Sequence, residues 1–419
     1  MSPLRLTVRF IFVLVLFGLL FSYAMFQGGF VSWFLFFSFL PVLLYSVYLA
    51  IYPMNWSQTE RKFSKKYAEA GQDVEVEITF RRLLPLPLFY IIVEDQLPEE
   101  IMWKETREKK YQFLSRPSIL KNRSPQKTII FPWFKRTVTF RYILDHIPRG
   151  SHHFSQVKMV SGDFLGMIKK ERVLSIPSVL HVKPWGRSLK QSNEMSTFDE
   201  GKQTAFSPQI RHTNMVAGVR DYAPGDRFSW VDWKTTAKKQ KLTTKEFEQE
   251  KHKDLTVMLN GIAPANRWLA FEASVEIGHA LAHQSLRLYG NVQMIFAGKE
   301  REEILLTNRK RSTEQLIQFL TSVRPVEEGS FYEQLTKEAI QRSQERNLLI
   351  VSSEINQQIG ETLIRLHQQG REIAFIFIAG KNQLQDDERA VIHRMKQSPV
   401  SFSWLKEEDL MRSQIEVNA

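Results

Sequence analysis

The first 52 residues contain two long apolar runs, at residues 10–26 and 30–52, and neither run carries a charged side chain. A helix rises about 1.5 Å per residue, so about 20 residues cross a hydrocarbon layer of about 30 Å. The second run is long enough for this, and the first is at the short end of the range. Only the sequence Gln-Gly-Gly separates them. The pattern therefore predicts a two-helix transmembrane hairpin within residues 1–56.

Basic residues lie on both sides of the predicted hairpin. Arg5 and Arg9 precede it, and the residues that follow it are Arg61, Lys62, Lys65 and Lys66. Because the cytoplasmic flanks of membrane helices are enriched in lysine and arginine, we expect both chain ends and the soluble remainder in the cytoplasm, at the cell membrane. The second cluster is also a candidate contact for anionic lipid. The alternative, a signal peptide followed by a buried helix, is disfavoured because no small-residue cleavage site separates the two runs.

After the hairpin, apolar and polar residues alternate, as in residues 73–82 (DVEVEITFRR). Short alternating stretches separated by turn residues are typical of antiparallel strands, so a sandwich-like β domain is predicted over residues 57–183. The basic residues 104–127 are predicted to form a long exposed loop. His152 and His153 are adjacent, and on a strand they would point to opposite faces, which favours a plain strand over a shared metal site.

Residues 184–217 are polar and weakly patterned, which predicts a linker. From residue 251 to 419, near-continuous apolar stretches alternate with amphipathic ones. This alternation predicts an α/β domain in which helices cover both faces of a mainly parallel sheet. The expected protein is therefore a membrane-anchored α+β multidomain chain. Ligands of such open sheets bind at the carboxyl ends of the strands, so these ends are candidate sites.

Composition narrows the possible chemistry. The 419 residues include no cysteine, which excludes disulfides, thiolate metal sites and cysteine nucleophiles and suits a reducing compartment. The formal net charge of +12 allows an anionic lipid surface or nucleic acid as a partner. The sequence carries no phosphate-binding glycine loop, nucleophile elbow or kinase signature.

One predicted helix carries four side chains of metal-binding chemistry at spacings of four, three and four residues, which places them on one stripe. They are Glu272, Glu276, His279 and His283. A metal site is disfavoured, because the sequence HALAH lacks the glutamate that zinc proteases place between their histidines. The opposite stripe is apolar and is expected to pack on the sheet, so the four residues are predicted to form a solvated polar face.

Residues 218–250 combine charged and aromatic side chains around a Pro224–Gly225 turn. Three interpretations of this segment are open. In the first, which we favour, Asp226 and Asp232 pair with nearby cations and packed aromatic rings, and this network clips the segment onto the α/β domain. The pairing cations are Arg220 or Lys234, since lone buried charges are costly.

In the second interpretation, Asp226 and Asp232 form an acid–base site, although the segment holds no nucleophile or histidine. In the third, the segment binds nucleic acid through a stacking Trp233 and a run of cations on the phosphates. These cations are Lys238, Lys239 and Lys241.

The same segment resembles the signature of the family called domain of unknown function 58, in its YeaD-type branch. The shared pattern is Gly-x-Arg-x-Tyr-x-x-Gly-Asp, then Asp-Trp-Lys, then a basic tail. The signature positions, which are the candidates for partner docking, are Gly218, Arg220, Asp221, Tyr222, Gly225, Asp226, Asp232, Trp233, Lys234, Ala237, Leu242 and Glu246. The order of hairpin, β domain and α/β domain also resembles this family, which implies a von Willebrand A-like, Rossmann-type α/β domain.

The chain departs from the family pattern at two places. Arginines are common in the family where Ser229 and Trp230 stand. Many members also carry an Asp, Ser, Ser motif for magnesium, and this chain has Asn260, Ile262 and Pro264 at those positions. Isoleucine and proline side chains supply no oxygen ligand, so the metal site is expected to be lost and no cofactor is expected.

The resemblance implies a partner of MoxR-type AAA+ ATPases, accompanied in some cases by a transglutaminase-like membrane protein. The predicted function is a non-enzymatic, membrane-anchored adaptor whose cytoplasmic domain docks a protein of such a system. The alternatives are a membrane-tethered hydrolase or transferase that uses Asp226 or Asp232, and a nucleic-acid-binding module.

Overall fold

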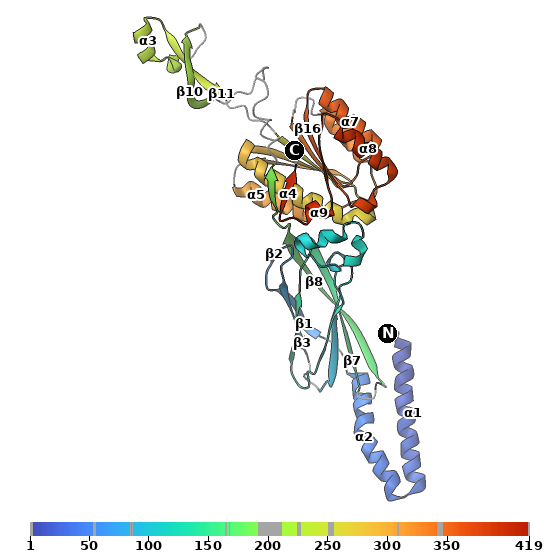
Figure 1. Cartoon of the computed structure of the whole chain (residues 1–419). Coiled ribbons are helices and arrows are strands. Elements are labelled where there is room, and N and C mark those ends of the chain that lie inside the picture. Colours follow the sequence, from blue (N-terminus) through green and yellow to red (C-terminus); the bar gives the residue numbers. More distant parts are fainter. Residues whose placement is uncertain are drawn as a thin grey trace.

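The computed structural model describes residues 3–52, 56–83, 85, 87–163, 166, 168–191, 212–223, 228–249, 255–307, 310–341 and 347–417. The described residues form a helical hairpin, a β module, an α/β module and a small projecting unit. Figure 1 shows the hairpin at one end of the molecule and the projecting unit at the other.

The N-terminal helices α1 (Pro3–Gln27) and α2 (Phe30–Ile51) are both long and apolar enough to cross a membrane. Large side chains such as Phe12, Phe34 and Phe37 are exposed, which leaves an apolar surface around the pair. The helices are joined at Gly28, whose φ of +60° is a conformation that glycine adopts without strain. The tip of the hairpin points away from the other modules (Figure 1).

The β module consists of two sheets with the strand orders β1–β3–β6 and β2–β8–β7–β4–β5. The strands are β1 (Trp56–Phe63), β2 (Tyr67–Glu69), β3 (Val74–Arg82), β4 (Tyr90–Asp95), β5 (Gln126–Ile130), β6 (Thr137–Leu144), β7 (Gly150–Gly162) and β8 (Lys169–Lys183). Burial alternates along β3 and β6, and Ile78 and Phe140 of one sheet share a core with Ile91 and Leu180 of the other. His152 is buried and His153 is exposed, so the prediction of opposite faces is confirmed.

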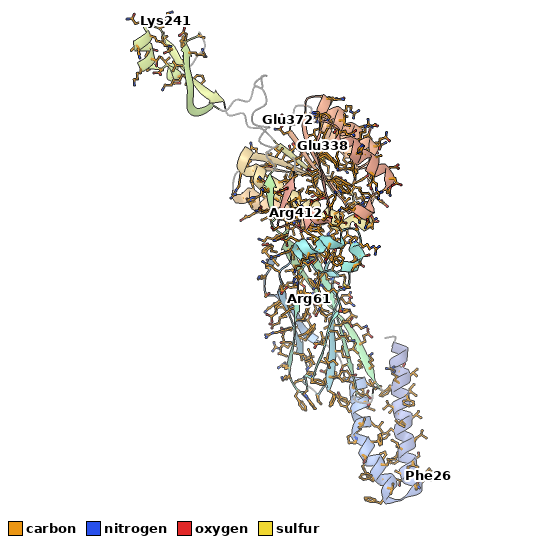
Figure 2. The ribbon with its side chains drawn as sticks, viewed as in Figure 1. Phe26, Arg61, Lys241, Glu338, Glu372 and Arg412 are labelled. Atoms are coloured by element: carbon orange, nitrogen blue, oxygen red, sulfur yellow. The ribbon has the colours of Figure 1, made fainter. Side chains whose placement is uncertain are left out.

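The basic residues after the hairpin do not gather beside it as the sequence predicted. Arg61 is buried in the β module, where its guanidinium pairs with Asp95 at 2.6 Å and donates to the Ile176 carbonyl at 2.7 Å (Figure 2). Lys65 and Lys66 follow β1, whose eight residues extend about 26 Å from the end of α2. The predicted lipid contact is therefore wrong for Arg61, because its side chain satisfies a buried carboxylate instead.

The predicted exposed loop at residues 104–127 is also wrong. The segment contains two 3₁₀ helices, η2 (Arg107–Phe113) and η3 (Pro117–Leu120), and follows η1 (Glu99–Ile101). Lys110 and Tyr111 of η2 are fully buried, because this segment packs between the β module and the α/β module.

The α/β module is built on a six-stranded sheet of order β14–β13–β12–β15–β16–β17. Its strands are β12 (Leu255–Asn260), β13 (Asn291–Ala297), β14 (Arg301–Thr307), β15 (Asn347–Ser352), β16 (Glu372–Ile378) and β17 (Ser401–Leu405). Only the β13–β14 pair among these is antiparallel. All of β12 is buried, since helices cover both faces of the sheet.

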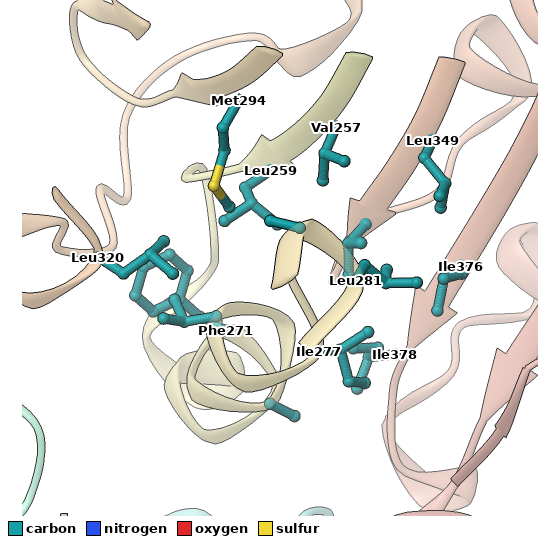
Figure 3. Packing of buried hydrophobic residues seen from close by; sticks show 14 of the residues in the cluster. Val257, Leu259, Phe271, Ile277, Leu281, Met294, Leu320, Leu349, Ile376 and Ile378 are labelled. Carbon is teal, nitrogen blue, oxygen red and sulfur yellow. The ribbon is translucent and has the colours of Figure 1, made fainter. Parts of the chain in front are cut away.

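The two faces of this sheet have separate cores. On one face, α4 (Trp268–Tyr289) and α5 (Lys310–Ser322) pack on the strands, and Figure 3 shows Phe271 of α4 beside Leu320 of α5. On the other face lie three helices, α6 (Phe331–Gln341), α7 (Gln357–Gln368) and α8 (Asp386–Lys396). The prediction of a mainly parallel sheet covered on both faces is confirmed.

The polar linker predicted over residues 184–217 is wrong at both ends. β9 (Ser188–Gln191) pairs in parallel with β18 (Gln414–Val417), which follows the short helix α9 (Glu407–Leu410). Leu189 and Ile415 pack against the α4 core, so tertiary pairing and not a local pattern creates this strand. A further strand, β10, begins at His212, and residues 192–211 lie outside the described residues.

The polar stripe of α4 forms an interface between the two modules and not the solvated face that the sequence predicted. The buried Glu276 carboxylate accepts hydrogen bonds from Lys110 Nζ at 2.5 Å and Tyr111 Oη at 2.7 Å. One turn earlier, the Glu272 carboxylate accepts two hydrogen bonds from the Arg149 guanidinium, at 2.8 and 3.0 Å. These charges are tolerated inside the protein because each has a partner from the other module.

The interface continues on both sides of Glu276. Lys110 Nζ also donates to Glu105 at 2.5 Å, so one ammonium group bridges carboxylates of both modules. His279 is partly buried, and burial lowers its pKa to about 4, whereas His283 at the end of the stripe is exposed. The four residues of the stripe therefore separate into an ionic interface and two histidines near its edge.

Replacing Glu276 with alanine should lower the free energy of unfolding by about 3 kcal/mol, because Lys110 and Arg187 lose a buried anion. Urea unfolding of the detergent-solubilised chain measures this change. As a matched control, Glu361→Ala removes an exposed ion pair with Arg394 and should cost less than about 1 kcal/mol. Equal losses for the two variants would contradict a structural role for the interface.

The interface should also respond to pH through Glu105. Burial raises the pKa of this carboxyl to about 7, against the opposing effect of Lys110. A raised folded-state pKa stabilises the fold at low pH, and this contribution is lost as the pH rises through about 7. The free energy of unfolding of the wild type, relative to that of Glu105→Gln, should thus decrease between about pH 5 and about pH 8. A difference that stays constant with pH would contradict it.

Candidate docking surface

The signature segment forms the projecting unit, an antiparallel ribbon capped by a short helix. β10 (His212–Asp221) pairs with β11 (Thr243–Gln249), with Gly218 opposite Glu246 and Asp221 opposite Thr243. Between the strands lie η5 (Phe228–Trp230) and α3 (Trp233–Lys239). Figure 1 shows this unit, which we call the signature extension, standing apart from both modules.

Local hydrogen bonds explain why α3 forms where it does. Asp232 is its N-cap residue, and the carboxylate accepts from Thr235 N at 3.3 Å, Lys234 N at 3.1 Å and Thr235 Oγ1 at 3.0 Å. These donors hold the pKa of Asp232 below its usual value, with the Thr235 amide as the largest cause. The helix ends at Gln240, whose φ of +56° is a left-handed conformation that stops the helix.

The extension has a small interior, and its exterior carries two large apolar side chains among lysines. Val231, Thr243 and Thr244 are buried, and the Thr236 and Thr243 hydroxyls lie 3.0 Å apart. In contrast, Trp233 is 64% exposed and Leu242 is 46% exposed. The other exposed side chains of the helix and the following turn are Lys234, Ala237, Lys238, Lys239, Gln240 and Lys241. Figure 2 places Lys241 at the far end of the molecule.

The favoured interpretation of this segment, a network that clips it onto the α/β domain, is wrong for the described residues. Asp232 is bonded to its own helix, and the Lys234 side chain is exposed. Arg220 is exposed and donates to the carbonyl of the adjacent Asp221 at 3.2 Å. Tyr222 lies at the ribbon end, where its amide donates to the Leu242 carbonyl. Gly225 and Asp226 lie outside the described residues.

The second candidate site was the end of the first strand of the α/β module. Asn260 is buried there, with its Oδ1 accepting from Ile262 N at 2.8 Å and its Nδ2 donating to Ser352 Oγ at 2.9 Å. Ile262 is buried and forms a backbone bridge with Val326, and Pro264 is exposed at the start of η6 (Ala265–Arg267). These three residues form the turn after β12. The side-chain amide of Asn260 is engaged in its hydrogen bonds with Ile262 and Ser352.

An internal ion pair covers the neighbouring strand end. The buried Arg267 guanidinium donates to both carboxylate oxygens of Glu388, each at 2.7 Å, and to the Ser353 carbonyl at 3.0 Å. Burial raises the pKa of Glu354 beside it, although Arg267 opposes this shift. The carboxyl ends of β12 and β15 are therefore filled by protein groups that bond to one another.

Comparison with known proteins identifies the family. Residues 218–383 match the family model described as "Protein of unknown function DUF58". The uncharacterized protein YeaD of Bacillus subtilis (strain 168) is 38% identical over 294 residues, which cover 70% of this chain and 69% of that protein. The chain belongs to the DUF58 family. In this DUF58 protein, the matched region comprises the signature extension and most of the α/β module.

Two solved structures also align with the DUF58 chain. They are Cwp6 from Clostridium difficile and a Paenibacillus sp. cycloisomaltooligosaccharide glucanotransferase complexed with cycloisomaltoheptaose. The identities are 9% and 8%, and the alignments cover 85% and 82% of this chain but only 55% and 52% of those chains. The TM-score is 0.16 in both cases, a likeness too weak to carry any argument.

Removal of the Asp232 cap should unwind α3. Asp232→Ala should destabilise the helix by about 1 kcal/mol, because the amides of Lys234 and Thr235 lose their acceptor. Asparagine caps helices about as well as aspartate, so Asp232→Asn is the matched control. Hydrogen exchange of the α3 amides should accelerate in the alanine variant alone. Equal exchange rates in the two variants would show that the cap does not hold the helix.

Proposed function

We propose that this DUF58 protein is a non-enzymatic, membrane-anchored adaptor that docks a protein partner through its signature extension. The exposed apolar helices α1 and α2 support the membrane anchor. Both ends of the hairpin lie on the same side, and Arg5 and Arg9 at the start of α1 support a cytoplasmic location of the modules.

The observation that carries the proposal is the exposure of Trp233 and Leu242 on a unit that stands apart from the rest of the chain. A tryptophan and a leucine that face water do not stabilise the fold by apolar burial. Large apolar side chains of this kind are the usual anchors of protein interfaces. Lys238, Lys239 and Lys241 surround them with positive charge, which favours a partner surface that is acidic at its rim.

The family resemblance supports a MoxR-type AAA+ ATPase as this partner, with a transglutaminase-like membrane protein as a further component of the system. We propose a von Willebrand A-like, Rossmann-type fold for the α/β module. Counted within the module, its strands have the order 3-2-1-4-5-6, which is the order of doubly wound α/β folds. The two sheets of the β module support a sandwich-like spacer between the membrane and this module.

A role for Asp232 as a catalytic acid or base receives no support from its geometry. Both of its carboxylate oxygens accept hydrogen bonds from α3, and its lowered pKa disfavours a proton-carrying form near neutral pH. The structural task of capping α3 accounts for the aspartate without a reaction. This supports the adaptor over a hydrolase or transferase that uses Asp232.

Docking can be measured by capture of a purified MoxR-type ATPase on the immobilised, detergent-solubilised chain, with and without ATP. Trp233→Ala and Leu242→Ala should each weaken binding by about 30-fold, the size of a central interface anchor. Ile340→Ala on α6 is a matched control, because Ile340 is also an exposed apolar residue but lies outside the extension. Equal capture by all three variants and the wild type would refute docking through the extension.

Single-stranded nucleic acid is a second candidate ligand, because Trp233 is exposed beside three lysines. Fluorescence anisotropy with a labelled oligonucleotide distinguishes nucleic-acid binding from docking of the ATPase. Binding to nucleic acid should weaken steeply with salt and with neutralisation of Lys238, Lys239 and Lys241 to glutamine. Binding of the ATPase through apolar anchors should depend mainly on Trp233 and Leu242.

A further inference from the structure

Two loops at one end of the β module expose a group of large apolar side chains. One loop joins β3 to β4 and carries Leu83, and the other joins β5 to β6 and carries Phe131, Trp133 and Phe134. Their exposed fractions are 59%, 56%, 52% and 66%, respectively. Lys135 and Arg136, also exposed, follow directly in the second loop. Such a concentration of exposed apolar residues marks an interaction surface.

The two loops are fastened together by a buried guanidinium. Arg82, at the end of β3, donates to the Trp133 carbonyl at 2.8 Å and through Nε to the Lys135 carbonyl at 2.8 Å. Leu88 and Trp133 form an antiparallel backbone bridge, and the rings of Phe89 and Trp133 are 5.5 Å apart. The loop pair is therefore a built surface and not a loose excursion of the chain.

Trp133, on this surface, has a strained backbone conformation. Its φ of +46° lies in the left-handed region, which is strained for a residue other than glycine. The hydrogen bonds of Arg82 and the bridge to Leu88 keep the backbone there. A strained residue retained on an exposed loop, with its indole half in solvent, is better explained by an external contact than by the core of the module.

The loop pair lies beside the end of α2. β1 begins four residues after Tyr52, and its first residue, Trp56, pairs with Arg82 immediately before the first loop. The Phe89 amide donates to Tyr45 Oη of α2 at 3.0 Å. Because Tyr45 precedes the end of α2 by six residues, this contact is about 9 Å below that end along the helix axis.

Other contacts hold the module to α2 beside Tyr45 and at the end of the helix. Ser46 Oγ donates to the Asp163 carboxylate at 2.5 Å, and Lys170 Nζ donates to the Tyr52 carbonyl at 2.8 Å. A helix that spans a bilayer leaves the hydrocarbon within its last turns, where aromatic side chains prefer the boundary with the headgroups. The exposed side chains of the loop pair are thus placed at the depth of that boundary.

We propose that the loop pair inserts Leu83, Phe131, Trp133 and Phe134 into the interfacial layer of the bilayer that α1 and α2 span. This rests on the proposed membrane anchor. The aromatic rings occupy the boundary between headgroups and acyl chains, and Lys135 and Arg136 lie at the level of the lipid phosphates. With the two helices, the loops make a third contact with the membrane, which restrains the tilt of the β module.

The absence of cysteine from the chain allows single-cysteine labelling without a background. Phe134→Cys, Ile143→Cys and Phe37→Cys are each labelled with an environment-sensitive fluorophore, and the full chain is reconstituted in vesicles of phosphatidylcholine and phosphatidylglycerol. Ile143 is a matched control, since it is 62% exposed on the same module but near the far end of β6. Phe37 reports the membrane span of α2.

Lipids with a quencher near the headgroup should remove most of the emission at position 134, with a shift to shorter wavelength, and leave position 143 unchanged. Lipids with a deep quencher should remove the emission at position 37. If position 37 is quenched and position 134 is not, the loop contact is refuted and the anchor stands. If position 37 is unquenched, the anchor itself fails.

A second measurement removes the influence of the probe at position 134. With the fluorophore at Leu83→Cys, the double substitution Phe131→Glu and Phe134→Glu should abolish quenching by the headgroup-labelled lipid, because two charges replace the inserted rings. Quenching that persists at position 83 would overturn the proposal. A shift to shorter wavelength at position 83 or 134 without lipid quenching would indicate a protein contact and would also overturn it.

Discussion

The ionic contact centred on Glu276 determines how the β module and the α/β module are joined. A buried carboxylate tolerates loss of water only if donors reach it from the right directions, and here those donors are Lys110 and Tyr111 of the other module. A shift of one helical turn, about 5.4 Å, would leave these charges buried and unpaired. The Arg149–Glu272 pair imposes the same condition one turn away. The joint therefore has one favourable arrangement.

This arrangement separates the two ends of the molecule. The joint makes a continuous body of the two modules, with the hairpin attached at one end and the signature extension at the other (Figure 1). The pairing of β9 with β18 adds a second connection, because it ties the segment that leaves the β module to the C-terminal strand. The proposed membrane anchor and the proposed docking unit thus lie at opposite ends, an arrangement that suits the adaptor role proposed above because it would hold a partner away from the lipid surface.

Sequence reasoning succeeded where a feature depends on residues that are close along the chain. The two apolar runs, the alternation in β3 and the buried strand β12 are such features, and each is found near the predicted place. It failed for Lys110 and the α4 stripe, which were predicted to be solvated, and for Arg61, which was predicted to contact lipid. Their partners are far away in the chain: Glu276 follows Lys110 by 166 residues, and Asp95 follows Arg61 by 34. No local pattern tells a paired charge from a solvated one.

The features of the candidate site also divide into those set by local sequence and those set by tertiary contacts. The Asp232 cap is a local feature of the signature sequence, because an N-cap side chain accepts hydrogen bonds from the amides two and three residues later. That Trp233 faces solvent, and that Leu83 and Trp133 are exposed on two neighbouring loops, depends on which elements pack against them. The sequence by itself thus determined the periodicity of the elements and the local bonds that start and stop them. Only the tertiary structure decided which charges are buried and which apolar side chains stay exposed, because burial is set by contacts between distant segments.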